Sequence, residues 1–143
     1  MLSVIEVKQG RVFIGKLPYE SDLLKAVKEV AEKHSIRSAV FFIIGSVKKA
    51  RLAYYHQIAK RYLDYYIEKP TEIISCIGNI AELEGQVFPH AHIVLSDSEG
   101  RTYGGHVLEG TIIFAAEIYV VELRDVALRR VYDEVTGLKL FQL

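Results

Sequence analysis

The stretch PHAHIVLSDSEGRTYGGH, residues 89–106, decides how this chain folds. An apolar run that carries two histidines ends in the polar segment Ser96–Thr102, which contains Gly100. A polar segment with a glycine between two such runs is typical of a hairpin turn. The sequence therefore predicts two antiparallel strands joined by a short loop.

The length of that loop fixes which residues face each other across the hairpin. A three-residue loop, residues 98–100 with the glycine in the left-handed conformation, is a common hairpin connection. This register pairs Asp97 with Arg101. Counted back along the strands, it also places His106 directly opposite His92.

Three histidines then meet on one face of the hairpin. Residues two apart in a strand point to the same face, so His90 and His92 share a side that His106 joins by register. Gly104 and Gly105 carry no side chains, which predicts open space beside the cluster. Three histidine ligands with an open fourth position suit catalytic zinc better than structural zinc. Two interpretations stay open: a site for zinc or another divalent metal, or a half-exposed sheet face whose histidines bind nothing.

Composition limits the classes of function. The chain has 143 residues, 18 basic and 18 acidic, so its formal net charge is zero. Proteins that live on nucleic-acid phosphates usually have a basic excess. The short basic clusters at residues 48–51, 60–61 and 129–130 are interpreted as solvated surface. The mean hydropathy of +0.16 is high for a small domain, and it indicates that some apolar surface lies in a subunit interface.

The single cysteine excludes an intrachain disulfide. Cys76 lies in an apolar run, so we interpret it as a buried, inert thiol. No signal-like segment opens the chain and no apolar run approaches membrane-spanning length. We therefore expect a cytoplasmic location and no membrane partner.

The rest of the chain predicts one helix and several strands. Ser21 is a suitable N-cap for a helix over residues 22–34, whose apolar residues recur at helical spacing. Strands are expected over residues 4–17, 37–44, 47–56, 62–67, 72–80 and 111–123, and a final strand within 129–143. With no repeat or linker, residues 1–143 are predicted to form one α+β domain, a mostly antiparallel sheet with one main helix near the N-terminus.

Short motifs spread along the chain resemble those of the PPC domain, the plant and prokaryote conserved domain. They are Gly45-Ser46, Glu72-Ile73-Ile74-Ser75, Gly78-Asn79-Ile80, His90-Ala91-His92, Ser96-Asp97, Gly100, Gly104-Gly105-His106-Val107-Leu108, Gly110 and Glu117-Ile118. The paired His-x-His and Gly-Gly-His elements are the specific part. The resemblance runs from about Arg11 to Leu143.

This resemblance implies a compact α+β domain that assembles as a homotrimer. Plant members carry the domain behind AT-hook segments that bind DNA, and prokaryotic members are labelled as DNA-binding on that basis. This chain has no Arg-Gly-Arg-Pro core of an AT-hook. The fold is also similar to that of acetolactate decarboxylase, an enzyme with a three-histidine zinc site, and that similarity supports His90, His92 and His106 as ligands.

Two functions follow as alternatives. The first is a trimeric metal-binding protein that acts as a lyase or hydrolase, with Glu109 or Glu117 as a nearby acid or base. Each carboxylate also has a plainer interpretation: Glu109 as an exposed turn residue, and Glu117 as the partner of a basic residue such as Arg51 or Arg101. The second function is a DNA-binding or protein-interaction module without catalysis.

Overall fold

The predicted hairpin is present in the computed structural model, which describes residues 2–143. Strands β5 (Gln86–Ser96) and β6 (Thr102–Val107) pair antiparallel, and His92 faces His106 in their ladder. The backbone N–H of Asp97 donates to the carbonyl of Arg101, and Gly100 has a positive φ of 76°. The loop length and the register expected from the sequence are therefore both confirmed.

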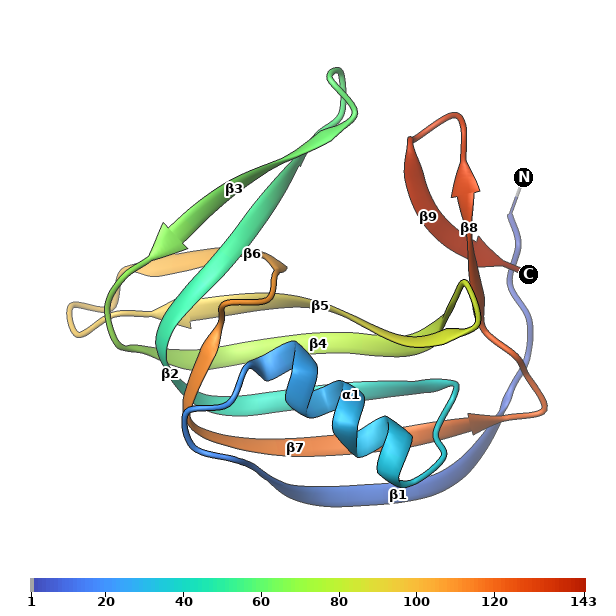
Figure 1. Cartoon of the computed structure of the whole chain (residues 1–143), viewed down its shortest axis with the longest axis horizontal. Coiled ribbons are helices and arrows are strands. Elements are labelled where there is room, and N and C mark those ends of the chain that lie inside the picture. Colours follow the sequence, from blue (N-terminus) through green and yellow to red (C-terminus); the bar gives the residue numbers. More distant parts are fainter. Residues whose placement is uncertain (1) are drawn as a thin grey trace.

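One sheet contains all the strands among the described residues, with one helix beside it (Figure 1). The other elements are β1 (Lys8–Leu17), α1 (Leu23–Lys33), β2 (Ala39–His56), β3 (Arg61–Ile67), β4 (Thr71–Leu83), β7 (Ile112–Arg124), β8 (Arg129–Asp133) and β9 (Leu138–Gln142). The strand order is β1-β7-β2-β6-β5-β4-β8-β9, and β3 pairs with β2. Neighbours run antiparallel except at the Glu82–Arg129 pair between β4 and β8. The predicted α+β class with a mostly antiparallel sheet is confirmed.

Strand β2 joins two segments that the sequence predicts separately. Its first half pairs with β4 and β7, and its second half with β3 and β6. The register with β4 shifts beside Gly45, whose φ is 142° and whose absent Cβ would overlap the backbone of Ala115. Because β2 also pairs with β4, the strands β2, β6, β5 and β4 close a ring. This closure holds β6 between β5 and β2.

Helix α1 covers one face of the sheet. Its N-cap is Asp22 rather than the predicted Ser21: the Asp22 carboxylate accepts from the Lys25 N–H at 3.1 Å and from the Gly110 N–H at 2.6 Å. The Ser21 hydroxyl instead donates to the carbonyl of Pro18. No helix among residues 2–143 is both long and apolar enough to span a membrane. The helix side chains buried against the sheet are Leu23, Ala26, Val27 and Ala31.

The two ends of the chain differ from prediction. Strand β1 begins at Lys8, four residues later than predicted. The tail forms a hairpin, β8 and β9, instead of one final strand. The turn is stabilised locally, because the Asp133 carboxylate accepts from the N–H of Thr136 at 2.8 Å and Gly137 has a φ of 75°. Figure 1 shows this hairpin standing away from the main body of the sheet, facing the projecting end of β2 and β3.

Candidate metal centre

The β5–β6 hairpin brings the three predicted ligands together. Ala91 and Ile93 are buried in the core, so the alternating residues His90 and His92 leave β5 on the opposite face. His106 reaches the same place from β6 because it pairs with His92. The three side chains form the one group of metal-ligand residues found among the described part of the chain.

The ring nitrogens are spaced as a metal ion requires. His90 Nε2 lies 3.3 Å from His92 Nε2 and 3.1 Å from His106 Nδ1, and all three donor atoms lie within 4.8 Å of one another. Zinc bonds of 2.0–2.1 Å in a tetrahedron put neighbouring nitrogens about 3.3 Å apart. The donor set and two of its three nitrogen–nitrogen distances therefore fit a divalent metal.

Burial keeps the rings in the form that a metal binds. Desolvation lowers the pKa of His90 to about 3, with further lowering from His106, Arg130 and His92. Desolvation also lowers the pKa of His106 to about 4, followed by the effects of His92 and Arg130. Both imidazoles are neutral at neutral pH, and a neutral imidazole has the free lone pair that ligation needs.

Arg130 and Asn79 surround the far side of His90, and sequence reasoning missed both. Arg130 Nη2 lies 3.2 Å from His90 Nδ1 and donates to Asn79 Oδ1 at 2.7 Å, while Nη1 donates to the Lys139 carbonyl at 2.9 Å. Asn79 Oδ1 accepts from Arg130, and Arg130, which has only donors, faces the His90 ring nitrogen that points away from the other two histidines. A pairing of the two strands β4 and β5 at the sequence level would have pointed to Asn79, because it lies opposite His90 in their register. Arg130 comes from β8 and was interpreted as solvated surface, but it is half-buried.

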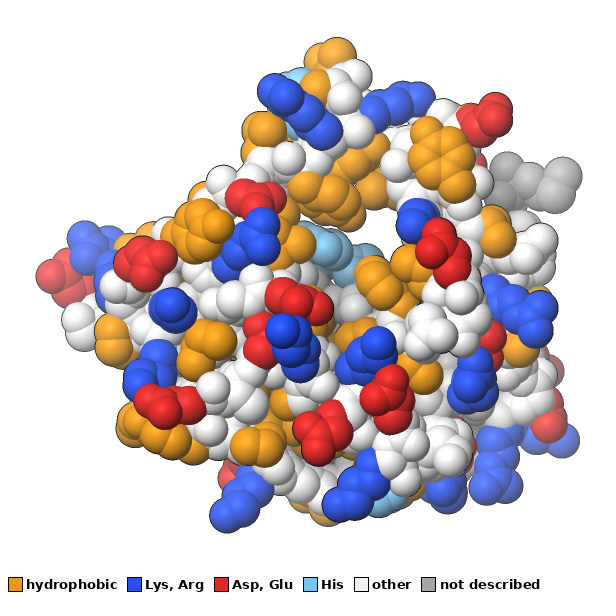
Figure 2. Space-filling view, viewed as in Figure 1, with side chains coloured by type: hydrophobic (Ala, Val, Ile, Leu, Met, Phe, Trp, Pro, Cys, Tyr) orange, Lys and Arg blue, Asp and Glu red, His pale blue; other side chains and the backbone are white. Residues whose placement is uncertain are grey.

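The histidines line a pocket of about 530 Å³. Tyr62 forms one wall, with its ring stacked on His106 at a centroid distance of 4.8 Å. Above it, the Tyr55 hydroxyl donates to the Thr136 carbonyl at 2.7 Å, so the β2–β3 end meets the β8–β9 hairpin. Figure 2 shows histidine side chains in a hollow framed by apolar groups. The lining residues are Ala53, Tyr54, Tyr55, Tyr62, Ser75, Ile77, His90, His92, Ile93, Val94, Gly104, Gly105, His106 and Leu138.

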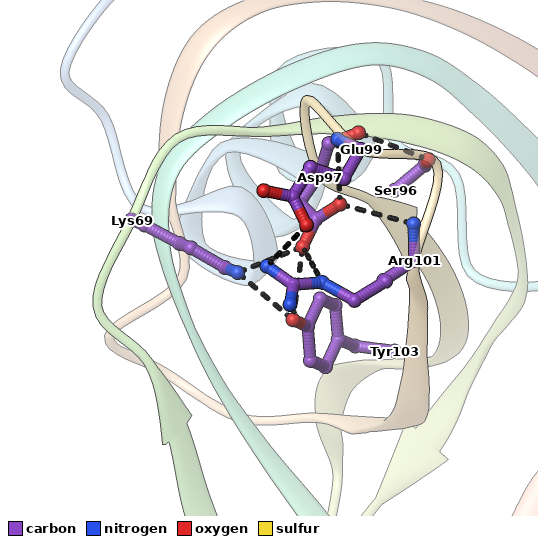
Figure 3. Close-up of polar contacts among 6 residues, drawn as sticks. All are labelled: Lys69, Ser96, Asp97, Glu99, Arg101 and Tyr103. Atoms are coloured by element: carbon purple, nitrogen blue, oxygen red, sulfur yellow. Dashed lines mark hydrogen bonds and ion pairs between the residues drawn. The ribbon is translucent and has the colours of Figure 1, made fainter.

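The loop that sets the histidine register is anchored by the buried carboxylate of Asp97 (Figure 3). It accepts from Lys69 Nζ and Arg101 Nε, each at 2.8 Å, and from the Tyr103 hydroxyl at 3.0 Å. It also accepts from the backbone N–H groups of Glu99 and Arg101, each at 3.0 Å. The Lys69 ammonium, followed by Arg101 and the two N–H groups, holds the pKa of this carboxyl far below its usual value. The carboxylate is therefore ionised at neutral pH, the form that accepts all five of these hydrogen bonds.

The two predicted acid–base residues lie outside the pocket of their own chain. Glu117 is exposed on β7, between Lys16 of β1 and Ile44 of β2 in the sheet register. Glu109 is also exposed and pairs with Lys25 at 3.4 Å. Their catalytic roles stay predictions.

The basic partners suggested for Glu117 are wrong. Arg51 pairs with Asp64, and Arg101 pairs with Asp97. Each arginine has a carboxylate on a neighbouring segment. Asp64 lies on β3, which pairs with β2, the strand of Arg51, and Asp97 closes the hairpin turn that ends at Arg101.

The open space predicted at the two glycines is only partly present. Gly104 and Gly105 both line the pocket, but a Cβ at Gly105 would overlap the Tyr65 hydroxyl, which donates to the Gly104 carbonyl. A Cβ at Gly104 would lie 3.2 Å from the carbonyl oxygen of Ile93. The space beside Gly105 is therefore filled by β3, a strand that the hairpin sequence could not reveal.

Cys76 is buried, and burial raises the pKa of its thiol to about 12. The prediction that this thiol is buried is confirmed. A buried thiol with so high a pKa forms almost no thiolate at neutral pH, so it supplies no ligand or nucleophile.

The fold and the site together define a class: a one-sheet α+β domain whose central hairpin carries three converging histidines. The chain belongs to the Plants and Prokaryotes Conserved (PCC) domain family, whose model matches residues 4–124. This is the PPC domain that the His-x-His and Gly-Gly-His motifs resemble. The family assignment made from these motifs is thereby confirmed.

Solved structures are similar to this chain over nearly its whole length. A metal-containing protein from Archaeoglobus fulgidus is 34% identical, with a TM-score of 0.94, and the match covers 99% of this chain and 100% of that one. A plant- and prokaryote-conserved protein from Pyrococcus horikoshii is 31% identical, with a TM-score of 0.92 and coverage of 99% and 98%. Both levels of identity extend the likeness beyond the fold to the family.

A curated relative is much longer. The bifunctional protein GlmU of Synechococcus sp. (strain JA-3-3Ab) is 28% identical over 129 residues, which cover 89% of this chain. The chain spans about a fifth of that relative's length (20%).

Proposed function

We propose that His90, His92 and His106 bind one divalent metal ion, with zinc as the ion that suits them best. The convergence of three imidazole nitrogens carries this proposal: His90 Nε2 lies 3.3 Å from His92 Nε2 and 3.1 Å from His106 Nδ1, and all three lie within 4.8 Å of one another. The metal-containing relative from Archaeoglobus fulgidus supports it. Three histidines leave a fourth position free, as in catalytic zinc sites.

The pocket around the three histidines determines which chemistry a bound ion would support. A bound zinc ion supplies a Lewis acid that polarises a carbonyl or lowers the pKa of a water molecule, which suits a lyase or a hydrolase. The chain's own part is to hold the rings in place beside the tyrosine walls. Arg130 lies behind His90 and is itself held by Asn79, to which it donates. An acid–base role for Glu109 or Glu117 would act on the pocket of a neighbouring subunit, because neither lines its own.

Metal analysis tests the proposal directly. Purified wild-type protein is expected to contain close to one equivalent of metal per chain, and His92→Ala is expected to lose most of it. His56→Ala is the matched control, because His56 lies at the end of β2, outside the cluster. Equal metal in wild type and His92→Ala would contradict the proposal, as would zinc-exchanged wild type that retains none after dialysis.

We further propose that the chain assembles as a homotrimer in the cytoplasm, as the family resemblance implies. The support is an apolar row across the sheet face that α1 leaves uncovered. Ile14 lies beside Tyr119, Tyr119 beside Phe42, and Phe42 beside Ile77, and the next residue in the row is His92. All four apolar side chains are exposed. Association of copies would bury them.

Light scattering at micromolar protein tests the assembly. A mass of three chains is expected for the wild type, and Phe42→Lys is expected to shift it towards the monomer. Ile58→Lys is the control, because Ile58 is exposed at the turn after β2 and is not part of the row. A wild-type protein that stays monomeric would contradict the proposal.

A further inference from the structure

The histidine pocket has no negative charge of its own. Its lining residues include no aspartate or glutamate. The three imidazoles are neutral ligands, so a divalent ion bound by them would keep its full charge of +2. Buried charge without a counter-charge is costly in an apolar setting.

Arg130 adds a second uncompensated cation next to the cluster. Its guanidinium contacts only neutral groups: Asn79 Oδ1, the Lys139 carbonyl, His90 Nδ1 and the ring of Phe141, whose centroid lies 4.6 Å away. It takes part in none of the ion pairs formed among residues 2–143, and its Nε is buried without a hydrogen-bond partner. The positive potential around the histidine cluster is therefore greater than the metal alone would give.

The side chains that line the rest of the pocket are apolar and aromatic. Tyr62 stacks on His106, and Ile77, Val94 and Leu138 line the same space. A volume of about 530 Å³ far exceeds the roughly 30 Å³ of one water molecule. The pocket therefore has room for a molecule with an apolar body as well as a polar head.

We propose that the pocket binds a small organic monoanion, a carboxylate with a planar apolar body. The carboxylate oxygens approach the histidine cluster, where the positive charge is uncompensated, and the body lies against Tyr62. The proposal rests on the proposed metal site, because the bound ion supplies most of the charge that the carboxylate balances. It names the class of ligand, which the three histidines alone do not.

Three simple probes separate charge from stacking. Cobalt-loaded protein is titrated with benzoate, benzamide and acetate while the visible spectrum of the cobalt site is followed. Benzoate is expected to bind at least about tenfold more tightly than benzamide, which has the same shape without the charge. It is also expected to bind at least about tenfold more tightly than acetate, which has the charge without the ring.

Variants of the tyrosine wall locate the ligand. Tyr62→Leu keeps an apolar side chain but removes the aromatic face, and it is expected to lower benzoate affinity about tenfold while acetate affinity and cobalt content stay unchanged. Tyr66→Leu is the matched control, because Tyr66 lies on the same strand and is not a lining residue. Equal loss in both variants would overturn the placement of the ligand body.

Failure of this inference differs from failure of the metal site. A protein that takes up no cobalt overturns both proposals. A protein that takes up cobalt but binds benzamide as tightly as benzoate, or binds neither at millimolar concentration, overturns only the anionic ligand.

Discussion

His92 lies directly opposite His106 in the β5–β6 ladder, and the carboxylate of Asp97 holds the loop that sets this register. A slip of one residue would send His106 to the other face of the sheet. The geometry of the candidate metal centre therefore depends on a turn that lies outside the pocket.

The first prediction concerns that turn. Asp97→Ala removes the acceptor of two backbone N–H groups and of charged donors from Lys69 and Arg101, so it is expected to lower the free energy of unfolding by about 2–4 kcal/mol. Asp97→Asn keeps one oxygen for the backbone groups and should cost less. Urea denaturation measures both, with the exposed Glu99→Ala as control, whose ion pair is worth at most about 1 kcal/mol. Equal midpoints for Asp97→Ala and Glu99→Ala would contradict this account.

The second prediction compares the two adjacent glycines. Gly105→Ala displaces the Tyr65 hydroxyl and breaks its hydrogen bond to the Gly104 carbonyl, so a loss of about 2–3 kcal/mol is expected. Gly104→Ala meets only the Ile93 carbonyl at 3.2 Å and should cost less. Thermal unfolding of both variants decides the order. The reverse order would mean that β3 does not pack on the hairpin as described.

Structural features that are set by neighbouring residues were predictable from the sequence, and features that depend on distant segments were not. The β5–β6 register was predictable, because loop length and one glycine fix it, and the positions of His90, His92 and His106 follow from it. The Arg130 contact was not, because it depends on how the C-terminal hairpin returns to the sheet, which no local pattern encodes.

Other differences have the same origin. Asp22 caps α1 in preference to Ser21 because its second oxygen binds Gly110, a residue far away along the chain. The unbroken course of β2 depends on Gly45 fitting against Ala115 of another strand. In each case a distant segment decides between two locally acceptable structures.

The third prediction is a pH dependence of stability in the metal-free protein. The pKa values of His90 and His106 fall to about 3 and about 4 in the folded state, below the ordinary value of 6.5. Between about pH 6.5 and 4, the unfolded chain binds protons at these histidines that the folded chain does not. Stability is therefore full above about pH 6.5 and falls as the pH is lowered through this window.

Melting temperatures of chelator-treated protein between pH 7.5 and 5 measure this effect. His106→Gln is expected to flatten the decline, because one of the two groups is gone. His56→Asn is the matched control outside the cluster and should leave the decline unchanged. A decline that is the same in wild type and His106→Gln would show that other groups control the acid response.

The last prediction is that this chain does not bind DNA tightly at physiological salt. Non-specific affinity needs several unpaired basic groups on one surface. Here Lys48 pairs with Glu20, and Arg51 with Asp64, while Lys60 Nζ donates to the Glu134 carbonyl. Two of the three basic side chains in the cluster at residues 48–51 are thus ion-paired within the fold, and the net charge of the chain is zero.

A trimer would gather three copies of any remaining patch, so the measurement must use the assembled protein. A/T-rich and G/C-rich duplexes are titrated at about 0.15 M salt, where the Debye length is about 8 Å. Dissociation constants weaker than about 10 μM are expected for both duplexes, without a preference between them. Micromolar or tighter binding, with a salt dependence that corresponds to several phosphates, would favour the DNA-binding alternative. The variant Lys49→Glu would then show whether the cluster at residues 48–51 contacts the DNA.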